Sequence, residues 1–288
     1  MPDNVIIRRF KLADIPRMLE IATNTFTEPG RRPTIALDML GYLDDQERQS
    51  TFVAEQGGRV VGYLLSRYHS EEERFGGQFG VDPECKGHGV GTKLMDSLAE
   101  YARSQGIDSI TGGTDYASGF YLKYGFELDW TQHKLVFEMV GNKLPEEPDL
   151  DIQAIGREDL DELLATIPEP DILEVLRPLF SSLENDGDKC LIAREKNCVK
   201  GVVIARTDKY DSDLASVTSL WGVALNYKLQ LLDALVRRCS WKGKRFLGVE
   251  AVSKAPGFEE FFKALEQRGY KDIPLPGWKS CYWMRKSV

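Results

Sequence analysis

The chain has 288 residues, of which 42% are hydrophobic and 28% charged, and its net charge is −8. This length exceeds one ordinary domain and suits two, each large enough to bury a core. An acidic chain without any basic run longer than "KGKR" is not expected to bind nucleic acid, and no apolar run is long enough to cross a membrane. Five scattered cysteines predict reduced thiols and a cytoplasmic location. The three histidines do not stand at ligand spacing, so no metal is expected.

Hydrophobic periodicity predicts alternating strands and helices along the first half of the chain. A strand–turn–strand signal surrounds Gly57 and Gly58, because two glycines between alternating apolar runs favour a tight hairpin. Asp14 is expected to cap the first helix, and Gly106 to end the second. In chain order, the expected elements are a strand at 5–10, a helix at 11–26, two strands within 51–68, a strand at 75–81, a helix at 92–106 and a strand at 107–113.

The second half of the chain repeats the pattern of the first. Val81 aligns with Val223, an offset of 142 residues, and a polar, proline-bearing segment at 141–151 separates the halves. We therefore expect a mixed α/β protein with two tandem domains, 1–143 and 149–288, each a twisted mixed sheet flanked by helices. The second copy lacks seven residues, since "ALNY" stands where the first copy has "DPECKGHGVGT".

The segment missing from the second copy is glycine-rich and lies between a predicted strand and a predicted helix. Such a segment exposes backbone N–H groups at the positive end of the helix dipole, which is a ready site for an anion such as phosphate. Lys86 adds a positive charge, and Thr92 can offer a hydroxyl or cap the helix. The order "GVGTK" does not fit the P-loop, and the glycine spacing does not fit the dinucleotide fingerprint. A tight turn without a ligand remains the alternative.

The spacing from Lys86 to Gly91 resembles the pyrophosphate loop of the GNAT superfamily of N-acetyltransferases, Gln/Arg-x-x-Gly-x-Gly/Ala. Lys86 departs from the usual residue but keeps a positive charge. Downstream, "ASGFYLKYGF" at 117–126 resembles the family's Ala-x-x-Leu/Phe-Tyr-x-x-x-Gly-Phe element, with Thr114 where Asn is usual. The resemblance covers residues 4–140 closely. In the second half it covers architecture only, which implies a tandem member of the family with a degenerate second domain.

The resemblance implies acetyl-CoA as cosubstrate and no metal. Backbone groups of the strand before the loop would bond the pantetheine arm, and loop N–H groups would hold the pyrophosphate. Gly76, Gly77 and Gly80 would mark bulges or close approach on that strand. The implied cofactor-binding residues are Phe79, Gly80, Val81, Lys86, Gly87, His88, Gly89, Val90, Gly91 and Thr92.

Acyl transfer needs a free amine, a polarised thioester carbonyl and a proton for the leaving thiolate. Tyr121 occupies the family's general-acid position, with a core aromatic as the alternative, and Tyr124 is expected to pack. Gln78 stands where some members carry a glutamate base. Deprotonation through ordered water is equally open. A cysteine nucleophile is not favoured at Cys85, and the remaining base candidates are Glu28, Asp82, Glu84, His88 and the run 71–73.

The function that the resemblance implies is N-acetyl transfer from acetyl-CoA to a primary amine of a small molecule or peptide. The first domain would be catalytically active, and the second would bind no CoA. Two alternatives are a non-catalytic acyl-CoA sensor and a purely structural tandem. The sequence leaves open the acceptor, the acyl-chain preference and the oligomeric state. A homodimer is one of the possible oligomeric states. The tryptophans of the second half, Trp221, Trp241, Trp278 and Trp283, are expected in the core or at an interface.

Overall fold

Two compact units make up the chain, and each is built around its own part of one β-sheet; the part in the first unit is called the first sheet below. The first unit contains residues 1–131 together with 281–288, and the second contains residues 132–280. No helix among the described residues is long and apolar enough to span a membrane. The computed structural model describes residues 5–25, 50–68, 73–115, 117–169, 171–182, 189–208, 211–240, 243–275 and 278–288.

The first unit follows the element order expected from the sequence. Gly57 and Gly58 form the predicted hairpin turn with positive φ angles of 57° and 78°, and Gly106 ends the helix of the glycine loop with a φ of 69°. Asp14 takes part in capping, although at the start of η1 rather than of α1: its carboxylate accepts the Lys11 N–H at 2.8 Å in a capping box and pairs with Arg8. The elements are β1 (Ile6–Arg9), η1 (Leu12–Asp14), α1 (Ile15–Thr25), β2 (Phe52–Gln56), β3 (Arg59–Tyr68), β4 (Glu73–Val81), η2 (Pro83–Cys85), α4 (Val90–Ser104), β5 (Ser109–Thr114), α5 (Ser118–Lys123) and the start of β6 (Glu127–Glu138).

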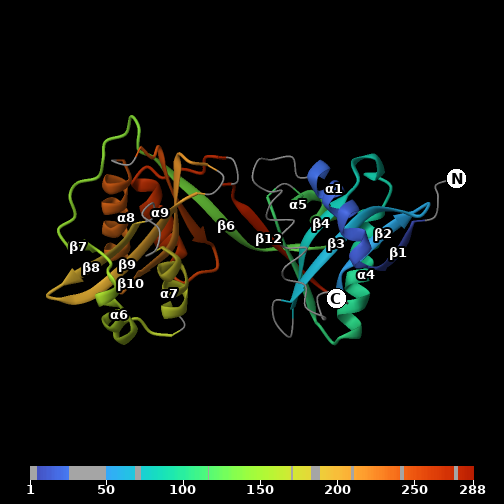
Figure 1. The fold of residues 1–288 in the computed structure, drawn as a ribbon, viewed down its shortest axis with the longest axis horizontal. Coiled ribbons are helices and arrows are strands. Elements are labelled where there is room, and N and C mark those ends of the chain that lie inside the picture. The colour runs from blue at the N-terminus through green and yellow to red at the C-terminus, as the bar shows by residue number, and fades with distance from the viewer. Residues whose placement is uncertain are drawn as a thin grey trace. The chain divides into compact units, whose positions relative to one another are not determined.

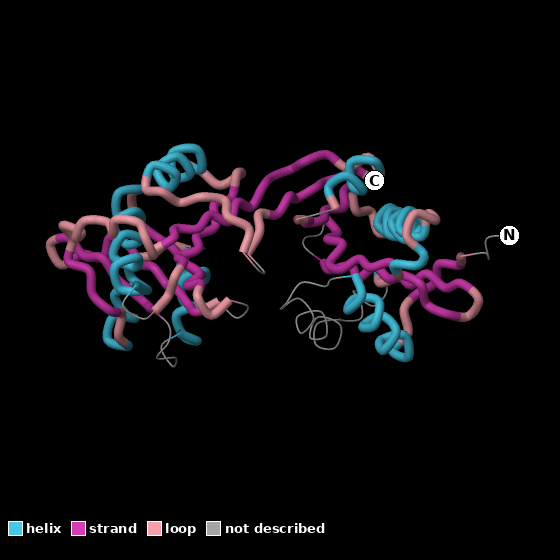
Figure 2. The backbone as a smooth tube through the Cα atoms, turned by 90° about the horizontal axis from the view of Figure 1, so that it is seen from above, coloured by secondary structure: helices cyan, strands magenta, loops and turns pink. Residues whose placement is uncertain are grey.

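Helices cover both faces of the first sheet, whose strands run in the order β1-β2-β3-β4-β5-β12-β6, with β12 spanning Cys281–Ser287. Alternate side chains of β3 explain the two layers. Leu64 packs with Leu94 and Leu98 of α4, whereas Tyr63 packs with Met18 of α1 on the other face. Figure 2 shows these two helices on opposite sides of the strands. The first sheet is therefore packed against a helix on each face.

Strands β4 and β5 diverge, and this leaves a gap between two neighbouring strands of the first sheet. They pair in parallel only from Glu73 to Phe75, opposite Ser109 to Thr111. Beyond Phe75, β4 keeps β3 as its partner, and within the described part of the chain it has none on the β5 side. A bulge at Gly77, which has no partner between Gln78 and Gly76, bends β4 where the strands part, as the glycines of this strand predicted. The divergence leaves room for a ligand between two strands.

The second unit repeats this order of elements, with its strands arranged β6-β11-β10-β9-β8-β7. Strands β10 and β11 also pair in parallel for only three residues, Leu214 to Ser216 opposite Phe246 to Gly248. The mixed α/β fold with two tandem copies is therefore confirmed. Its elements are β7 (Asp151–Ala154), η3 (Arg157–Asp159), α6 (Leu160–Thr166), α7 (Asp171–Ser182), β8 (Lys189–Glu195), β9 (Cys198–Thr207), β10 (Leu214–Gly222), α8 (Leu225–Ser240), β11 (Phe246–Val252) and α9 (Phe258–Gln267).

The two units differ from the contiguous domains 1–143 and 149–288 that the sequence predicts. The last strand, β12, pairs antiparallel with β5 and so completes the first unit, where the C-terminus also lies (Figure 1). Conversely, residues Gln132 to Glu138 of β6 pair with β11 of the second unit. Each half of the chain thus donates a strand to the unit formed mainly by the other. Local periodicity predicts a strand but not its partner, which is why the boundary was placed at the linker.

Replacing Met284 with alanine is expected to destabilise the first unit by about 2–5 kcal/mol, as for other buried methionines. Met284 is 2% exposed and packs in the core that α4 covers, although it lies near the end of the chain. Arg285→Ala is the control, because its pair with Asp129 is half-exposed and contributes at most about 1 kcal/mol. Urea unfolding measures both variants. Equal midpoints for the two would show that β12 does not support the first core.

Candidate functional site

A cleft of about 440 Å³ lies in the first unit, where β4 has parted from β5. Its walls come from four parts of the chain: the end of α1, the end of β4, the glycine loop with the first turn of α4, and the start of α5. This is the size and setting of a small-molecule site. The lining residues are Thr25, Phe79, Val81, Cys85, Lys86, Gly87, Gly89, Val90, Gly91, Thr92, Ala117 and Phe120.

The glycine loop delivers free backbone N–H groups to this cleft. Helix α4 begins at Val90, two residues before the predicted start at Thr92, and its N-cap is Gly89. Gly89 has a φ of 79°, a conformation that residues with a Cβ adopt only with strain. No side chain caps the helix, so Thr92 does not act as the cap. The N–H groups of the first turn are therefore available at the positive end of the helix dipole.

Gly91 keeps the floor of the cleft open. A Cβ built on Gly91 would lie 2.8 Å from Cζ of Phe79, closer than non-bonded carbons approach. The Phe79 ring packs against Phe120 from α5, with ring centroids 5.3 Å apart. The two rings and the glycine therefore form one apolar wall beside the polar loop.

Most of the residues predicted to bind the cofactor meet at this cleft. Gly80 and His88 do not line it. Gly80 instead makes room for Tyr63, whose ring Cε1 lies 2.7 Å from the position of a Gly80 Cβ. His88 is exposed on the loop. The residues of the prediction that line the cleft are Phe79, Val81, Lys86, Gly87, Gly89, Val90, Gly91 and Thr92.

Tyr121 is buried behind the cleft wall, with 6% of its surface exposed. Its ring packs against Phe126 at a centroid distance of 5.1 Å, and its hydroxyl lies 3.3 Å from the position that a Cβ on Gly112 would occupy. Gly112 is the first residue of β5 beyond the last pair with β4. The Tyr121 hydroxyl therefore lies at the point where the two strands begin to part. Tyr121 itself does not line the cleft, whereas the neighbouring Phe120 does.

Tyr124 packs, as predicted. Its hydroxyl donates a hydrogen bond to Oδ1 of Asp96 at 2.5 Å, and Nζ of Lys286 lies 3.9 Å from its ring centroid. Burial, together with the Asp96 carboxylate, raises the pKa of the Tyr124 phenol above its usual value. This hydroxyl is accordingly a poor proton donor.

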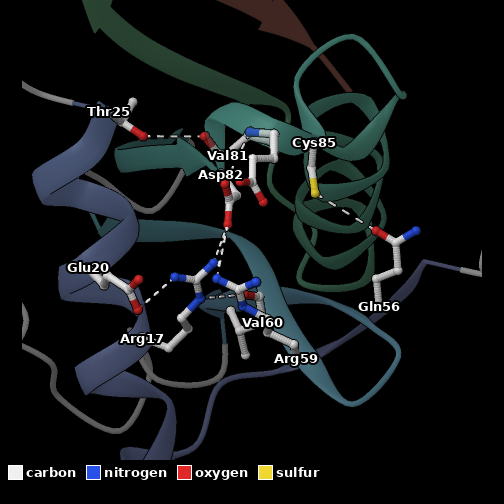
Figure 3. A network of polar contacts seen from close by, with 10 residues as sticks. Arg17, Glu20, Thr25, Gln56, Arg59, Val60, Val81, Asp82 and Cys85 are labelled. Carbon is white, nitrogen blue, oxygen red and sulfur yellow. Dashed lines mark hydrogen bonds and ion pairs between the residues drawn. The ribbon is translucent and has the colours of Figure 1, made fainter.

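An ion-pair network holds the start of the glycine loop (Figure 3). Asp82, 7% exposed, follows β4 and pairs with Arg17 of α1; Arg59 lies 3.8 Å away. Oδ1 of Asp82 also accepts the Glu84 N–H at 3.1 Å, which fixes the turn into the loop. Arg17 donates in addition to the Val60 carbonyl at 3.0 Å. Sequence reasoning missed this network because Arg17 and Asp82 are 65 residues apart.

Replacing Arg17 with methionine is expected to cost about 3 kcal/mol of stability, because it leaves the buried Asp82 carboxylate with only the longer contact to Arg59 as an ion pair. Burial works against the charge of Arg17, yet its pairs with Glu20 and Asp82 still raise its pKa above the ordinary value. The affinity for acetyl-CoA, the cosubstrate that the sequence resemblance implies for this cleft, should fall as well, since Asp82 holds the turn. Glu20→Gln is the control, because Glu20 is exposed and its pair contributes less than about 1 kcal/mol. Urea unfolding and calorimetric titration measure the two effects; identical results for both variants would contradict them.

The structure narrows the set of candidates for the catalytic base. Asp82 is engaged by Arg17, and Gln78 lies on β4 with its amide oxygen buried. Burial, and then the nearby Asp82 carboxylate, raise the pKa of the Cys85 thiol. Less of the reactive thiolate forms as a result, which agrees with the expectation that Cys85 is not a nucleophile. Glu84 is exposed on the surface. Glu28 and the side chains of residues 71–73 lie outside the described residues.

One lining residue was not predicted by any motif. Thr25 ends α1, and its hydroxyl donates to the Val81 carbonyl at 3.3 Å, so it closes the cleft from the side of α1 (Figure 3). No spacing rule links Thr25 to the loop, so the sequence offered no signal for it. Ala117 and Phe120 belong to the recognised downstream element, although only Tyr121 was singled out there. Among the described residues, no cluster of His, Cys, Asp and Glu side chains could hold a metal ion.

Solved structures place the fold among the GNAT acetyltransferases. A GCN5-related N-acetyltransferase from Sphaerobacter thermophilus superposes with a TM-score of 0.67 at 13% identity, over 100% of this chain and 96% of that one. A tandem GNAT protein from the clavulanic acid biosynthesis pathway superposes with a TM-score of 0.62 at 14% identity, over 99% and 98%. At these identities the likeness establishes the fold.

Sequence comparison gives a likeness to the same family. The model of the acetyltransferase (GNAT) family matches residues 15–126 of the chain. The uncharacterized N-acetyltransferase MJ1530 of Methanocaldococcus jannaschii is 34% identical over 97 residues, which are 34% of this chain and 58% of that protein. The mycothiol acetyltransferase of Thermobispora bispora is 25% identical over 142 residues, 46% of this chain and 48% of that protein. The chain spans about half the length of the curated relatives it matches.

Proposed function

We propose that this protein transfers an acetyl group from acetyl-CoA to a primary amine, using the cleft of the first unit. Two observations carry the proposal: the cleft at the end of β4 has helix N–H groups in its wall, and the Tyr121 hydroxyl lies behind that wall beside Gly112, where β4 and β5 part. The helix N–H groups suit a diphosphate, and the edge of β4 beyond Phe75 suits an extended pantetheine arm. The thioester would then reach the point where the strands part.

The acetyl transfer would proceed by direct attack. A neutral amine adds to the thioester carbonyl, the C–N bond forms, and the C–S bond breaks as the tetrahedral intermediate collapses. Tyr121 would give its proton to the leaving thiolate and be reprotonated from solvent, while the amine releases its proton through water. A backbone N–H near Val81 would polarise the carbonyl. The second unit would take no part, because only Val223 and Ala224 separate β10 from α8, where the first unit has the whole glycine loop.

Incubation of the full chain with acetyl-CoA and a pooled set of amines tests the proposal. The released thiol and the mass increase of an acetylated amine are the expected products. A non-catalytic acyl-CoA sensor is the second candidate, favoured by Gln78 at the strand position of a carboxylate base and by the engagement of Asp82. Binding of acetyl-CoA without thiol release across the whole set would support the sensor. Absence of binding would contradict both.

A further inference from the structure

The second unit contains a cleft of its own, which acetyl transfer does not use. It measures about 590 Å³, within the usual range for small-molecule sites. Residues of α7, β10, α8 and β11, together with the turn before α9 and Phe261 of α9, surround it. Its lining residues are Asp171, Glu174, Val175, Val217, Thr218, Ser219, Leu220, Trp221, Lys228, Val249, Glu250, Ala255, Pro256 and Phe261.

The backbone forms this cleft in the same way as it forms the cleft of the first unit. Strands β10 and β11 separate after Ser216 and Gly248, and the lining residues of both strands lie beyond that point. A bulge at Thr218, which is skipped between Val217 and Ser219 in the register with β9, bends β10 at the opening. Gly77 occupies the corresponding position on β4. Parted strands and a bulge are therefore kept in the second unit, although its glycine loop is gone.

The charge of this cleft excludes a diphosphate and favours a cation. Three carboxylates line it, those of Asp171, Glu174 and Glu250, against the single ammonium of Lys228. Lys134 and Gln132 contact Glu250, and Asp171 accepts the indole N–H of Trp221 at 3.1 Å. Within the described part of the chain, Glu174 forms no ion pair and is exposed at the cleft. It is therefore available to a ligand.

Aromatic and aliphatic side chains supply the rest of the wall. Trp221 is half-buried, and its hydrogen bond to Asp171 fixes the indole beside a carboxylate. Trp221 is thus a wall of the cleft, rather than only the core or interface residue that its sequence predicted. Phe261, Val217 and Leu220 add apolar surface. An ammonium group is attracted both to carboxylates and to aromatic faces, and the apolar walls suit the carbon skeleton attached to it.

We propose that the cleft between β10 and β11 binds a small organic amine, whose ammonium group meets Glu174 and Asp171 and whose apolar part lies against Trp221 and Phe261. This site is separate from the cleft of the first unit and does not depend on acetyl transfer. It gives the second unit a ligand of its own in place of the coenzyme that its shortened loop cannot hold.

Calorimetric titration of the full chain with 2-phenylethylamine, without acetyl-CoA, tests the proposal. The amine should bind, and Glu174→Gln and Asp171→Asn should each weaken it about tenfold, the loss expected for one charged hydrogen bond. Glu260→Gln is the matched control, because Glu260 is an exposed carboxylate of the same unit that does not line the cleft. It should bind the amine as the unaltered chain does.

Two further titrations locate the site and define its charge preference. A chain with Gly91→Leu, which blocks the first cleft, should bind 2-phenylethylamine with unchanged affinity. The anion 3-phenylpropionate, similar in size, should not compete. The proposal is overturned if no amine binding is seen, if Glu174→Gln and Asp171→Asn bind as well as the unaltered chain, if Gly91→Leu removes the binding, or if the anion binds equally well.

Discussion

Replacing Gly91 with leucine is expected to weaken acetyl-CoA binding roughly a hundredfold, equivalent to about 2.7 kcal/mol. Gly91 lies in the first turn of α4, on the floor of the cleft, and even a Cβ there would meet the Phe79 ring at 2.8 Å. A leucine side chain must displace that ring or fill the cleft, and overpacking of this kind costs about 1–3 kcal/mol. Calorimetric titration with acetyl-CoA measures the effect.

Gly119→Leu is the matched control for this variant. Gly119 is also a helical glycine, on α5 at the edge of the site, but a Cβ built there has no atom within 4 Å. Its affinity for acetyl-CoA should stay within about twofold of the unaltered chain. If Gly91→Leu bound acetyl-CoA as tightly as the control, the coenzyme would have to lie elsewhere on the molecule.

Replacing Tyr121 with phenylalanine is expected to lower kcat by about 100-fold or more, the usual contribution of a positioned general acid. The dissociation constant for acetyl-CoA should hardly change, because the ring and its contacts with Phe126 are kept. The hydroxyl lies beside Gly112, where the strands part and the thioester is expected. Initial rates with a saturating amine, together with a binding titration, separate the two quantities.

Tyr124→Phe provides the comparison on the same helix end. The Tyr124 hydroxyl donates to Asp96, and the pKa of this phenol is raised. Tyr124→Phe therefore removes a phenolic oxygen, as Tyr121→Phe does, but leaves the proposed proton donor in place. This variant should keep kcat within a few-fold. Equal rates for Tyr121→Phe and the unaltered enzyme would remove Tyr121 from the mechanism and leave the thiolate to be protonated by water.

The parts of the molecule that the sequence predicts best are those fixed by local chemistry. The hairpin at Gly57 and Gly58 and the end of α4 at Gly106 follow from backbone conformations that favour glycine. The glycine loop also lies between β4 and α4, as expected, and lines the cleft of the first unit; its role as an anion site stays a prediction. The helix start was placed two residues late, because Gly91 is a poor helix former that the cleft nevertheless requires inside the first turn.

Features that depend on distant partners were not predictable in the same way. The pair of Arg17 with Asp82, and the position of Thr25 beside Val81, bring together residues that no periodicity connects. Gly80 was predicted to bind the cofactor, but it faces the side of the first sheet where Tyr63 packs and so contacts Tyr63 instead of the cleft. Pairing of β12 with β5 is the extreme case, since the strand lies beyond the whole second unit in the sequence.

The pairing of β12 with β5 has a consequence for how the protein is made. During synthesis, β5 emerges from the ribosome long before its neighbour β12, so one edge of the first sheet stays open until the second unit has been translated. The chain therefore cannot be divided at the linker into two independently stable halves. A premature stop codon within the second unit should therefore also leave the core of the first unit incomplete. The truncated protein should be degraded by proteases rather than persist as a working fragment.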